Sequence, residues 1–182
     1  MKASNWVLSC LATLCLALIP WVAAEEAEQA PAPQDARLEF LKALRGTWVS
    51  EVDHAEMGEQ VFEFRVTAGG HAVEEREMIG TPMEMLTVYY LEGKDVVGTH
   101  FCVLGNRPRV KATTRVENNT LTFACNGTPG NAKSHDEEHV HGWSMRLDDD
   151  GRLHYSAELV RDGQVTEAPI VVLTRRAETA SR

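Results

Sequence analysis

The chain has 182 residues, enough for one domain with a substantial core and too few for two ordinary ones. Its formal net charge of −9 at pH 7 argues against nucleic acid and anionic membranes as partners, because such a surface repels phosphate groups. Residues 25–182 contain no Gly-x-Ser-x-Gly elbow, phosphate loop, dinucleotide fingerprint or Cys-x-x-Cys pair, which removes support for those enzyme classes.

Residues 1–24 have the pattern of a cleavable signal peptide. Lys2 precedes an apolar run over 6–22, and Ala23 and Ala24 form a small-residue cleavage site. The alternative is a retained membrane anchor, for which the run is short compared with the about 20 residues of a span. We therefore expect an exported protein, periplasmic or extracellular, with no stable membrane anchor after cleavage.

The next segment changes from irregular to helical. Residues 25–34 are acidic, rich in Ala and Pro and without periodicity, which predicts a disordered leader. After it, Leu38, Leu41 and Leu44 recur at helical spacing, and Gly46 supplies a stop. This pattern predicts one short amphipathic helix.

From Gly46 onward, apolar residues recur at every second position, which is typical of half-buried strands. The expected strands cover 47–53, 60–67, 71–79, 84–91, 96–104, 109–117, 120–125, 138–147, 152–161 and 165–175. No helix lies between them to make a parallel crossover, and closure into a barrel removes the open edges. The sequence thus predicts an all-β domain over 35–176, an antiparallel up-and-down barrel of about ten strands, followed by a disordered tail at 177–182. A two-sheet sandwich is the alternative.

Both ends of the expected barrel carry residues of a known superfamily. Gly46-Thr47-Trp48 lies where the helix leads into the first strand, and Val171-Val172-Leu173-Thr174-Arg175-Arg176 forms the last one. These segments resemble the lipocalin and wider calycin superfamily. The resemblance implies that Arg175 lies across Trp48 and seals the barrel floor, as a cation over an indole face. The segments 85–90, 99–102, 105–109 and 139–141 are similar to exported bacterial lipocalin-like proteins of unassigned function, so the resemblance implies a fold and no activity.

The most informative segment is 139–147, which alternates cleanly between two faces. One face carries His139, His141, Trp143, Met145 and Leu147. A slip by one residue would expose the large apolar side chains of this face and bury Arg146. We therefore expect both histidines to point into the barrel.

The strand 96–104 places His100 and Cys102 on one face, but both of its faces are partly apolar and the direction stays open. If this face points inward, the cavity holds three imidazoles, from His100, His139 and His141, and one thiol. Such a set suits zinc, copper or haem iron. The alternative is that these groups only hydrogen-bond one another, buried water or a ligand.

The same resemblance makes haem a candidate cofactor, because nitrobindin-type barrels, which bind haem, have a related fold. Their glycine-rich continuation after the first Trp is missing here, since Trp48 leads into Val-Ser-Glu-Val-Asp. A metal ion or haem is therefore a possible cofactor and not the leading expectation.

Cys102 and Cys125 remain after removal of the signal peptide, in a compartment where a disulfide is permitted. They lie on strands separated by a third one, about 9–10 Å apart, whereas a disulfide needs Cα atoms within about 6–7 Å. Whether they pair stays open.

Three polar segments have two interpretations each. The turn 105–109 offers Asn106 and Arg109 as ligand-binding groups, or is a solvated turn whose arginines pair with surface acids. The loop 126–138 is a lid over the barrel mouth or a mere connection. The run Glu74, Glu75 and Glu77 suggests paired acid and base groups, but we interpret it as the solvated face of a strand in an acidic protein.

The expected function is that of an exported binding protein that holds a small, largely apolar or amphipathic molecule in the barrel cavity. The candidate ligand-binding residues are His100, Cys102, Asn106, Arg109, His139, His141 and Trp143, with Gly46, Trp48 and Arg175 in structural roles. The alternative is a barrel enzyme, or a metal- or haem-binding protein, that uses His100, His139 and His141.

Overall fold

The computed structural model describes residues 35–52, 58–113 and 115–177. The predicted signal peptide, the predicted leader and residues 178–182 of the predicted tail lie outside these ranges. No helix in the described part is long and apolar enough to cross a membrane.

The predicted helix is present as α1 (Ala36–Ala43). The Asp35 side chain caps its first turn by accepting a hydrogen bond from the Arg37 backbone N–H at 2.9 Å. Leu38, Leu41 and Leu44 are fully buried, so the three leucines at helical spacing form the face that packs on the sheet.

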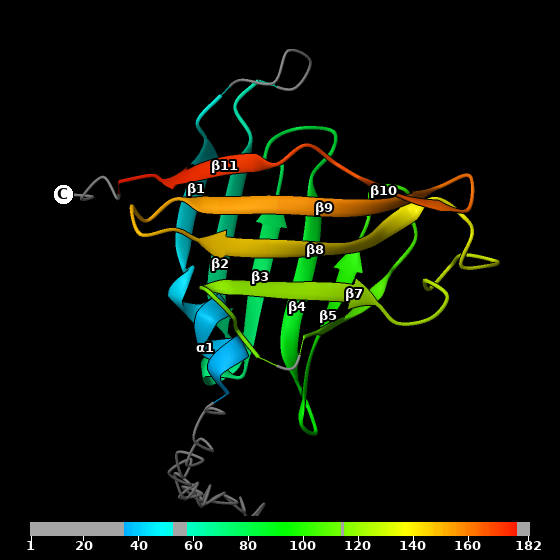
Figure 1. Cartoon of the computed structure of the whole chain (residues 1–182), viewed down its shortest axis with the longest axis horizontal. Helices are drawn as coiled ribbons and strands as arrows, with labels where there is room; N and C mark the ends of the chain where they lie inside the picture. The colour runs from blue at the N-terminus through cyan, green and yellow to red at the C-terminus, as the bar shows by residue number, and fades with distance from the viewer. Residues whose placement is uncertain (1–34, 53–57, 114, 178–182) are drawn as a thin grey trace, which may run out of the picture.

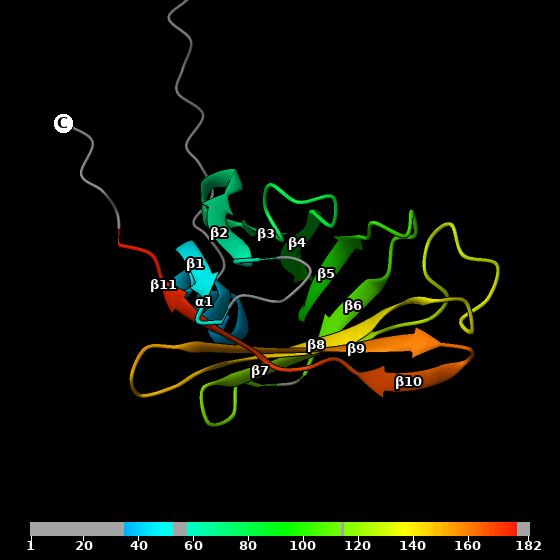
Figure 2. The ribbon, with the colours of Figure 1, turned by 90° about the horizontal axis from the view of Figure 1, so that it is seen from above.

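Eleven strands follow the helix. They are β1 (Gly46–Ser50), β2 (Val61–Thr67), β3 (Ala72–Glu77), β4 (Met85–Glu92), β5 (Asp95–Phe101), β6 (Arg109–Ala112), β7 (Thr120–Cys125), β8 (His139–Leu147), β9 (Leu153–Arg161), β10 (Gln164–Glu167) and β11 (Val171–Arg175). From β1 to β9 each strand pairs antiparallel with the next, and β11 pairs with both β9 and β1. Ten strands thus close into an antiparallel barrel, and the views in Figures 1 and 2 show the strands curving round a common interior. The predicted all-β barrel with one short helix is confirmed.

Two expected strands differ clearly from those in the structure. β6 ends at Ala112 instead of 117, and the chain then turns back through Asn118 and Asn119, which both have positive φ angles. The expected strand 165–175 is divided into β10 and β11. Pro169 lies in the break, where it has no N–H to give to a strand ladder. β9 therefore pairs with β10 along its second half and with β11 along its first half.

Helix α1 covers one end of the barrel. Arg37 donates hydrogen bonds to the carbonyl groups of Lys94, between β4 and β5, and of Thr113, beyond β6. Trp48 of β1 is fully buried and donates from Nε1 to the Leu44 carbonyl at 2.7 Å. These contacts tie the helix to the barrel floor.

The last strand locks this floor. The Arg175 guanidinium carbon lies 4.3 Å from the centre of a Trp48 ring, the contact that the resemblance implies. Arg175 also donates to the carbonyl groups of Arg45 and Ala43, just beyond and at the end of α1. Gly46 has a φ of 124°, and a Cβ there would lie 2.9 Å from Arg175 Nη1, so glycine is required at this corner.

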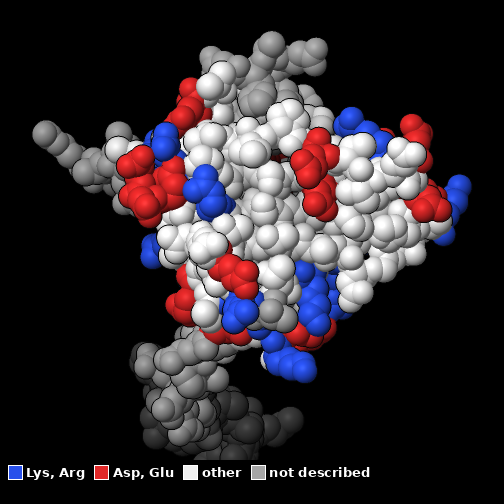
Figure 3. Space-filling view, viewed as in Figure 1, with Lys and Arg blue, Asp and Glu red and all other residues white. Residues whose placement is uncertain are grey.

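Charged side chains gather toward the edges of the face seen in Figure 3, which is formed largely by β7, β8, β9 and β11, while its middle is mostly uncharged. Lys and Arg lie beside Asp and Glu on this face (Figure 3). The charges on this face are therefore mixed in sign.

Candidate functional site

A cavity of about 390 Å³ opens at the end of the barrel away from α1. Its walls include Met78 and Met83, which lie between β3 and β4. They also include Val103 and Leu104, which lie between β5 and β6. In an up-and-down barrel, alternate connections lie at opposite ends, and the β4–β5 connection meets α1. The floor is thus closed by the helix and the mouth lies at the other end.

The cavity walls are mainly apolar. The apolar lining consists of Phe62, Met78, Met83, Met85, Val103, Leu104, Val140, Ala157, Leu159, Ala168, Pro169 and Val171. The polar lining is small, namely Gln60, Glu77, Cys102, Glu138, Tyr155 and Arg161. Arg161 and Glu138 pair with each other at 3.2 Å. Apolar walls with a few polar groups are the usual composition of a small-molecule site.

Two carboxyl groups from β3 point into the barrel. Glu75 is fully buried and Glu77 is 7 % exposed. The strand register explains their direction, because Glu75 stands opposite Phe64 of β2, whose ring is also buried in the core. The interpretation of this run as a solvated face is wrong for Glu75 and Glu77, while Glu74 points outward and pairs with Arg65 at 2.7 Å.

Hydroxyl groups and an imidazole surround these acids. The Tyr89 hydroxyl donates to a Glu75 carboxylate oxygen. His100 points inward and is 1 % exposed, with Nδ1 2.9 Å from the Thr87 hydroxyl and 3.6 Å from Glu77 Oε1. The direction of His100, left open by the sequence, is thus resolved.

Burial favours the uncharged forms of Glu75, Glu77 and His100. Desolvation raises the pKa of Glu77 to about 7, against a hydrogen bond from Thr87 that acts the other way. Desolvation and the neighbouring Glu77 raise the pKa of Glu75 well above its usual range. Desolvation lowers the pKa of His100 to about 4. Near neutral pH the site therefore holds a neutral imidazole, and Glu77 is close to its titration point.

These buried acids were missed in the sequence analysis, although a pattern for them exists. Residues Val73, Glu75 and Glu77 alternate with outward Glu74 and Arg76, and Val73 is fully buried. Glu75 and Glu77 share a strand face with the apolar Val73, which indicates that their carboxyl groups point inward. The acidic character of the run obscured this pattern.

A β-bulge overturns the predicted direction of two histidines. The β8–β9 register shifts between Val140 and Gly142, so that His141 is an extra residue. Trp143 and Met145 are buried inside as expected, but Val140, in place of His139, lines the cavity.

His139 and His141 instead pack against His135 of the loop 126–138, with ring centres 5.0 and 5.2 Å from the His135 ring. His100 packs against Trp143 inside, with ring centres 5.7 Å apart. The predicted cavity set of His100, His139 and His141 is therefore divided between two places.

Asn106 and Arg109 of the turn 105–109 contact other parts of the protein. Arg109 is exposed, pairs with Glu92 on the barrel surface and lies outside the lining of the cavity. Asn106 is buried, and its amide donates to the Glu138 carbonyl at 2.8 Å. This bond ties the turn to the end of the loop 126–138.

The two described cysteines are free thiols. Cys102 lines the cavity, with its sulfur 4.0 Å from the sulfur of Met85, and burial raises the pKa of its thiol. Cys125 lies beside His135 and His139. The two cysteines are therefore not paired with each other: one thiol faces the cavity and the other lies beside the histidines.

The cavity lining bears on haem as a possible cofactor. Haem iron in histidine-ligated sites is held by an axial imidazole directed at the ring. Within the described part of the chain, the lining of the cavity contains no histidine.

The fold and the cavity define a class: a closed ten-stranded antiparallel barrel, compatible with a calycin-like fold, with a mainly apolar cavity and buried acids beside it. No protein-family model matches the chain, and no curated protein sequence matches it.

Proposed function

We propose that the protein binds a small, largely apolar molecule in the barrel cavity, and that the head group of this molecule donates a hydrogen bond to Glu77. The observation that carries the proposal is a buried carboxyl group in the lining of an otherwise apolar cavity. An amine or a hydroxyl group is the head group that this arrangement favours. In keeping with residues 1–24, we propose that the protein does so after export.

The free energy of the empty site supports this proposal. Burying a carboxyl group without a cation lowers the stability of a protein. Arg37 is the one buried Lys or Arg in the described part of the chain, and it is held by Asp35 at the helix. The imidazole nearest to Glu77, that of His100, has its pKa lowered to about 4 by burial and is neutral near pH 7. A ligand that donates to Glu77 would offset the unfavourable desolvation, which gives a reason for the residue at this place.

The test uses displacement of the neutral dye Nile red by three matched eight-carbon compounds. We expect octylamine and 1-octanol to displace the dye from the full chain at pH 8 at concentrations about tenfold lower than octanoate, because ionised Glu77 accepts their hydrogen bonds and repels a carboxylate. Glu77→Gln should reduce this preference. Equal displacement by all three compounds would contradict the proposed head group.

Two variants test the location. Ala157→Phe fills the cavity and should abolish dye binding, whereas Val165→Phe on the exposed strand β10 should leave it unchanged. Far-UV circular dichroism checks that both variants are folded. Dye uptake that survives Ala157→Phe would place binding elsewhere.

A further inference from the structure

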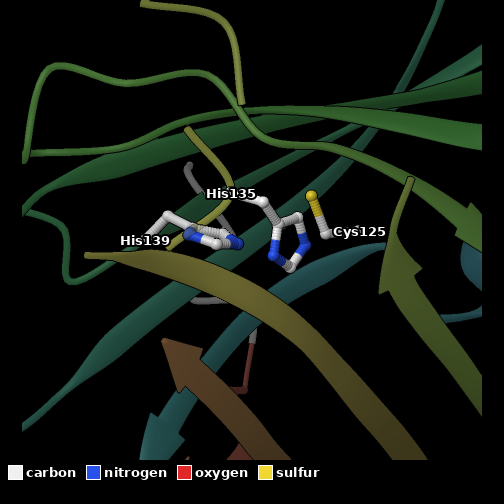
Figure 4. A group of neighbouring side chains, drawn as sticks. All are labelled: Cys125, His135 and His139. Atoms are coloured by element: carbon white, nitrogen blue, oxygen red, sulfur yellow. The ribbon is translucent and has the colours of Figure 1, made fainter. Parts of the chain in front are cut away.

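A second cluster of chemically reactive side chains lies apart from the cavity. Cys125 at the end of β7, His135 in the loop 126–138 and His139 at the start of β8 place one ligand atom each within 4.8 Å of the others. Figure 4 shows His135 between the Cys125 thiol and the His139 ring. His141, the extra residue of the bulge, lies next to them with its ring centre 5.2 Å from that of His135.

Two buried ring nitrogens of the histidines have no hydrogen-bond partner, which points to a ligand between them. His139 is fully buried, and its Nε2 has no hydrogen-bond partner. The buried Nδ1 of His141 has none either. Buried ring nitrogens without partners are unfavourable, so this arrangement calls for an electron-pair acceptor between the rings.

The orientation of His139 is that of a metal ligand. Its Nδ1 lies 2.7 Å from the Glu137 carbonyl oxygen, which can only accept, so Nδ1 carries the proton and Nε2 keeps a free electron pair. Metal-bound histidines are commonly held in this way, with the second nitrogen donating to a carbonyl or carboxylate.

The frame around the cluster is fixed by neighbouring turns. Arg107 and Gly130 form a β-bridge, and Asn131 donates to the Gly105 carbonyl at 3.2 Å. Together with the bond from Asn106 to Glu138, these contacts hold both sides of the loop against the β5–β6 turn. The loop that carries His135 is thus anchored on each side of it.

We propose that Cys125, His135 and His139 bind a Zn²⁺ ion, with His141 as the fourth ligand. One thiolate and imidazole nitrogens are ligands that Zn²⁺ prefers, and tetrahedral coordination needs ligand atoms about 3.3–3.8 Å apart. The observed separations within 4.8 Å reach this range through small side-chain rotations. Binding deprotonates the Cys125 thiol and joins β7, β8 and the loop. This site does not rest on the function proposed for the cavity.

Titration of the metal-free, reduced full chain with Zn²⁺ alone tests the proposal by calorimetry. We expect one ion per chain, and at least about a 100-fold loss of affinity in Cys125→Ser and in His139→Ala, since even outer-shell changes weaken such sites 10- to 100-fold. Cys102→Ser and His154→Gln are the matched controls, because they remove the other described cysteine and a histidine of the outer face without touching the cluster.

Co²⁺ gives a second, spectroscopic readout that does not depend on affinity. The wild-type chain should show a thiolate-to-cobalt charge-transfer band, which Cys125→Ser removes and Cys102→Ser retains. Far-UV circular dichroism reports whether each variant keeps the folded barrel, independently of any binding in the cavity. No Zn²⁺ binding by the wild type, or binding unchanged in both folded cluster variants, would overturn the proposal.

Discussion

Glu77 makes the stability of the barrel depend on pH. Its pKa is about 7 in the folded protein against 4.5 for the ordinary group, so between these values the folded state keeps a proton that the unfolded chain releases. A rise in pH through this window therefore lowers the free energy of unfolding. We expect Glu77→Gln to be more stable than the wild type at pH 8, by on the order of 2 kcal/mol, and to lose this advantage toward pH 5.

Urea denaturation of both proteins at the two pH values measures this difference. The lowered pKa of His100 acts in the opposite direction, because its stabilising contribution is lost as the pH falls below 6.5 toward 4. Comparing the two proteins at each pH subtracts the part of this contribution that they share. Glu74→Gln is the control, since it changes an outward residue of the same strand. An advantage of Glu77→Gln that is equal at both pH values would contradict the explanation.

At the scale of secondary-structure elements, Arg175 joins α1, β1 and β11. It combines a cation–π contact to Trp48 with hydrogen bonds to the carbonyl groups of Ala43 and Arg45. We expect Arg175→Ala to lower the free energy of unfolding by about 1–3 kcal/mol. Arg176→Ala, which removes an exposed pair with Glu59, should change it by less than about 1 kcal/mol. Chemical denaturation followed by tryptophan fluorescence measures both, and equal effects would remove this role.

The bulge in β8 requires the glycine that follows it. A Cβ on Gly142 would lie 2.5 Å from the Phe123 carbonyl oxygen, a backbone atom of the paired strand β7. We expect Gly142→Ala to lower the free energy of unfolding by on the order of 2–3 kcal/mol, because the two strands must separate to admit the methyl group.

Ser144→Ala tests the same strand without this clash. It removes one hydrogen bond, to Ser156 at 2.8 Å, and should change the free energy of unfolding by about 1 kcal/mol or less. Urea denaturation compares the two variants. If Gly142→Ala is as mild as Ser144→Ala, the close approach at the bulge does not constrain the strand.

Strand alternation predicted most elements well, and its error at His139 has a physical cause in the bulge of β8. It located β8 and the inward Trp143 and Met145, because burial of large apolar side chains fixes their side of the sheet. Alternation did not predict the direction of His139, because the extra residue His141 reverses the inward and outward positions before it. Gly142 inside the strand was the available sign of a bulge, since an isolated glycine in a strand often marks one.

At the scale of the whole molecule, the period-two pattern predicted about ten antiparallel strands, and the need to remove open edges favoured a closed barrel over the alternative sandwich. The residues that line its cavity were harder to predict from the sequence, because the lining depends on which residues of distant strands come together. Glu77, Tyr155 and Cys102 line one cavity from β3, β9 and the segment after β5. Side-chain direction can be inferred within one strand, but the depth of each residue in the barrel follows from the register between strands.

Closure of the barrel between β1 and β11 also determines when the protein can fold. Trp48 pairs with Arg175 across 127 positions of chain, so the ladder of β1 lacks one partner until the final strand has left the ribosome. The strands from β1 to β9 assemble from neighbours, whereas this last pairing must overcome the entropy of closing almost the entire domain into a loop. The ladder of β1 is therefore completed only after the last strand has been synthesised.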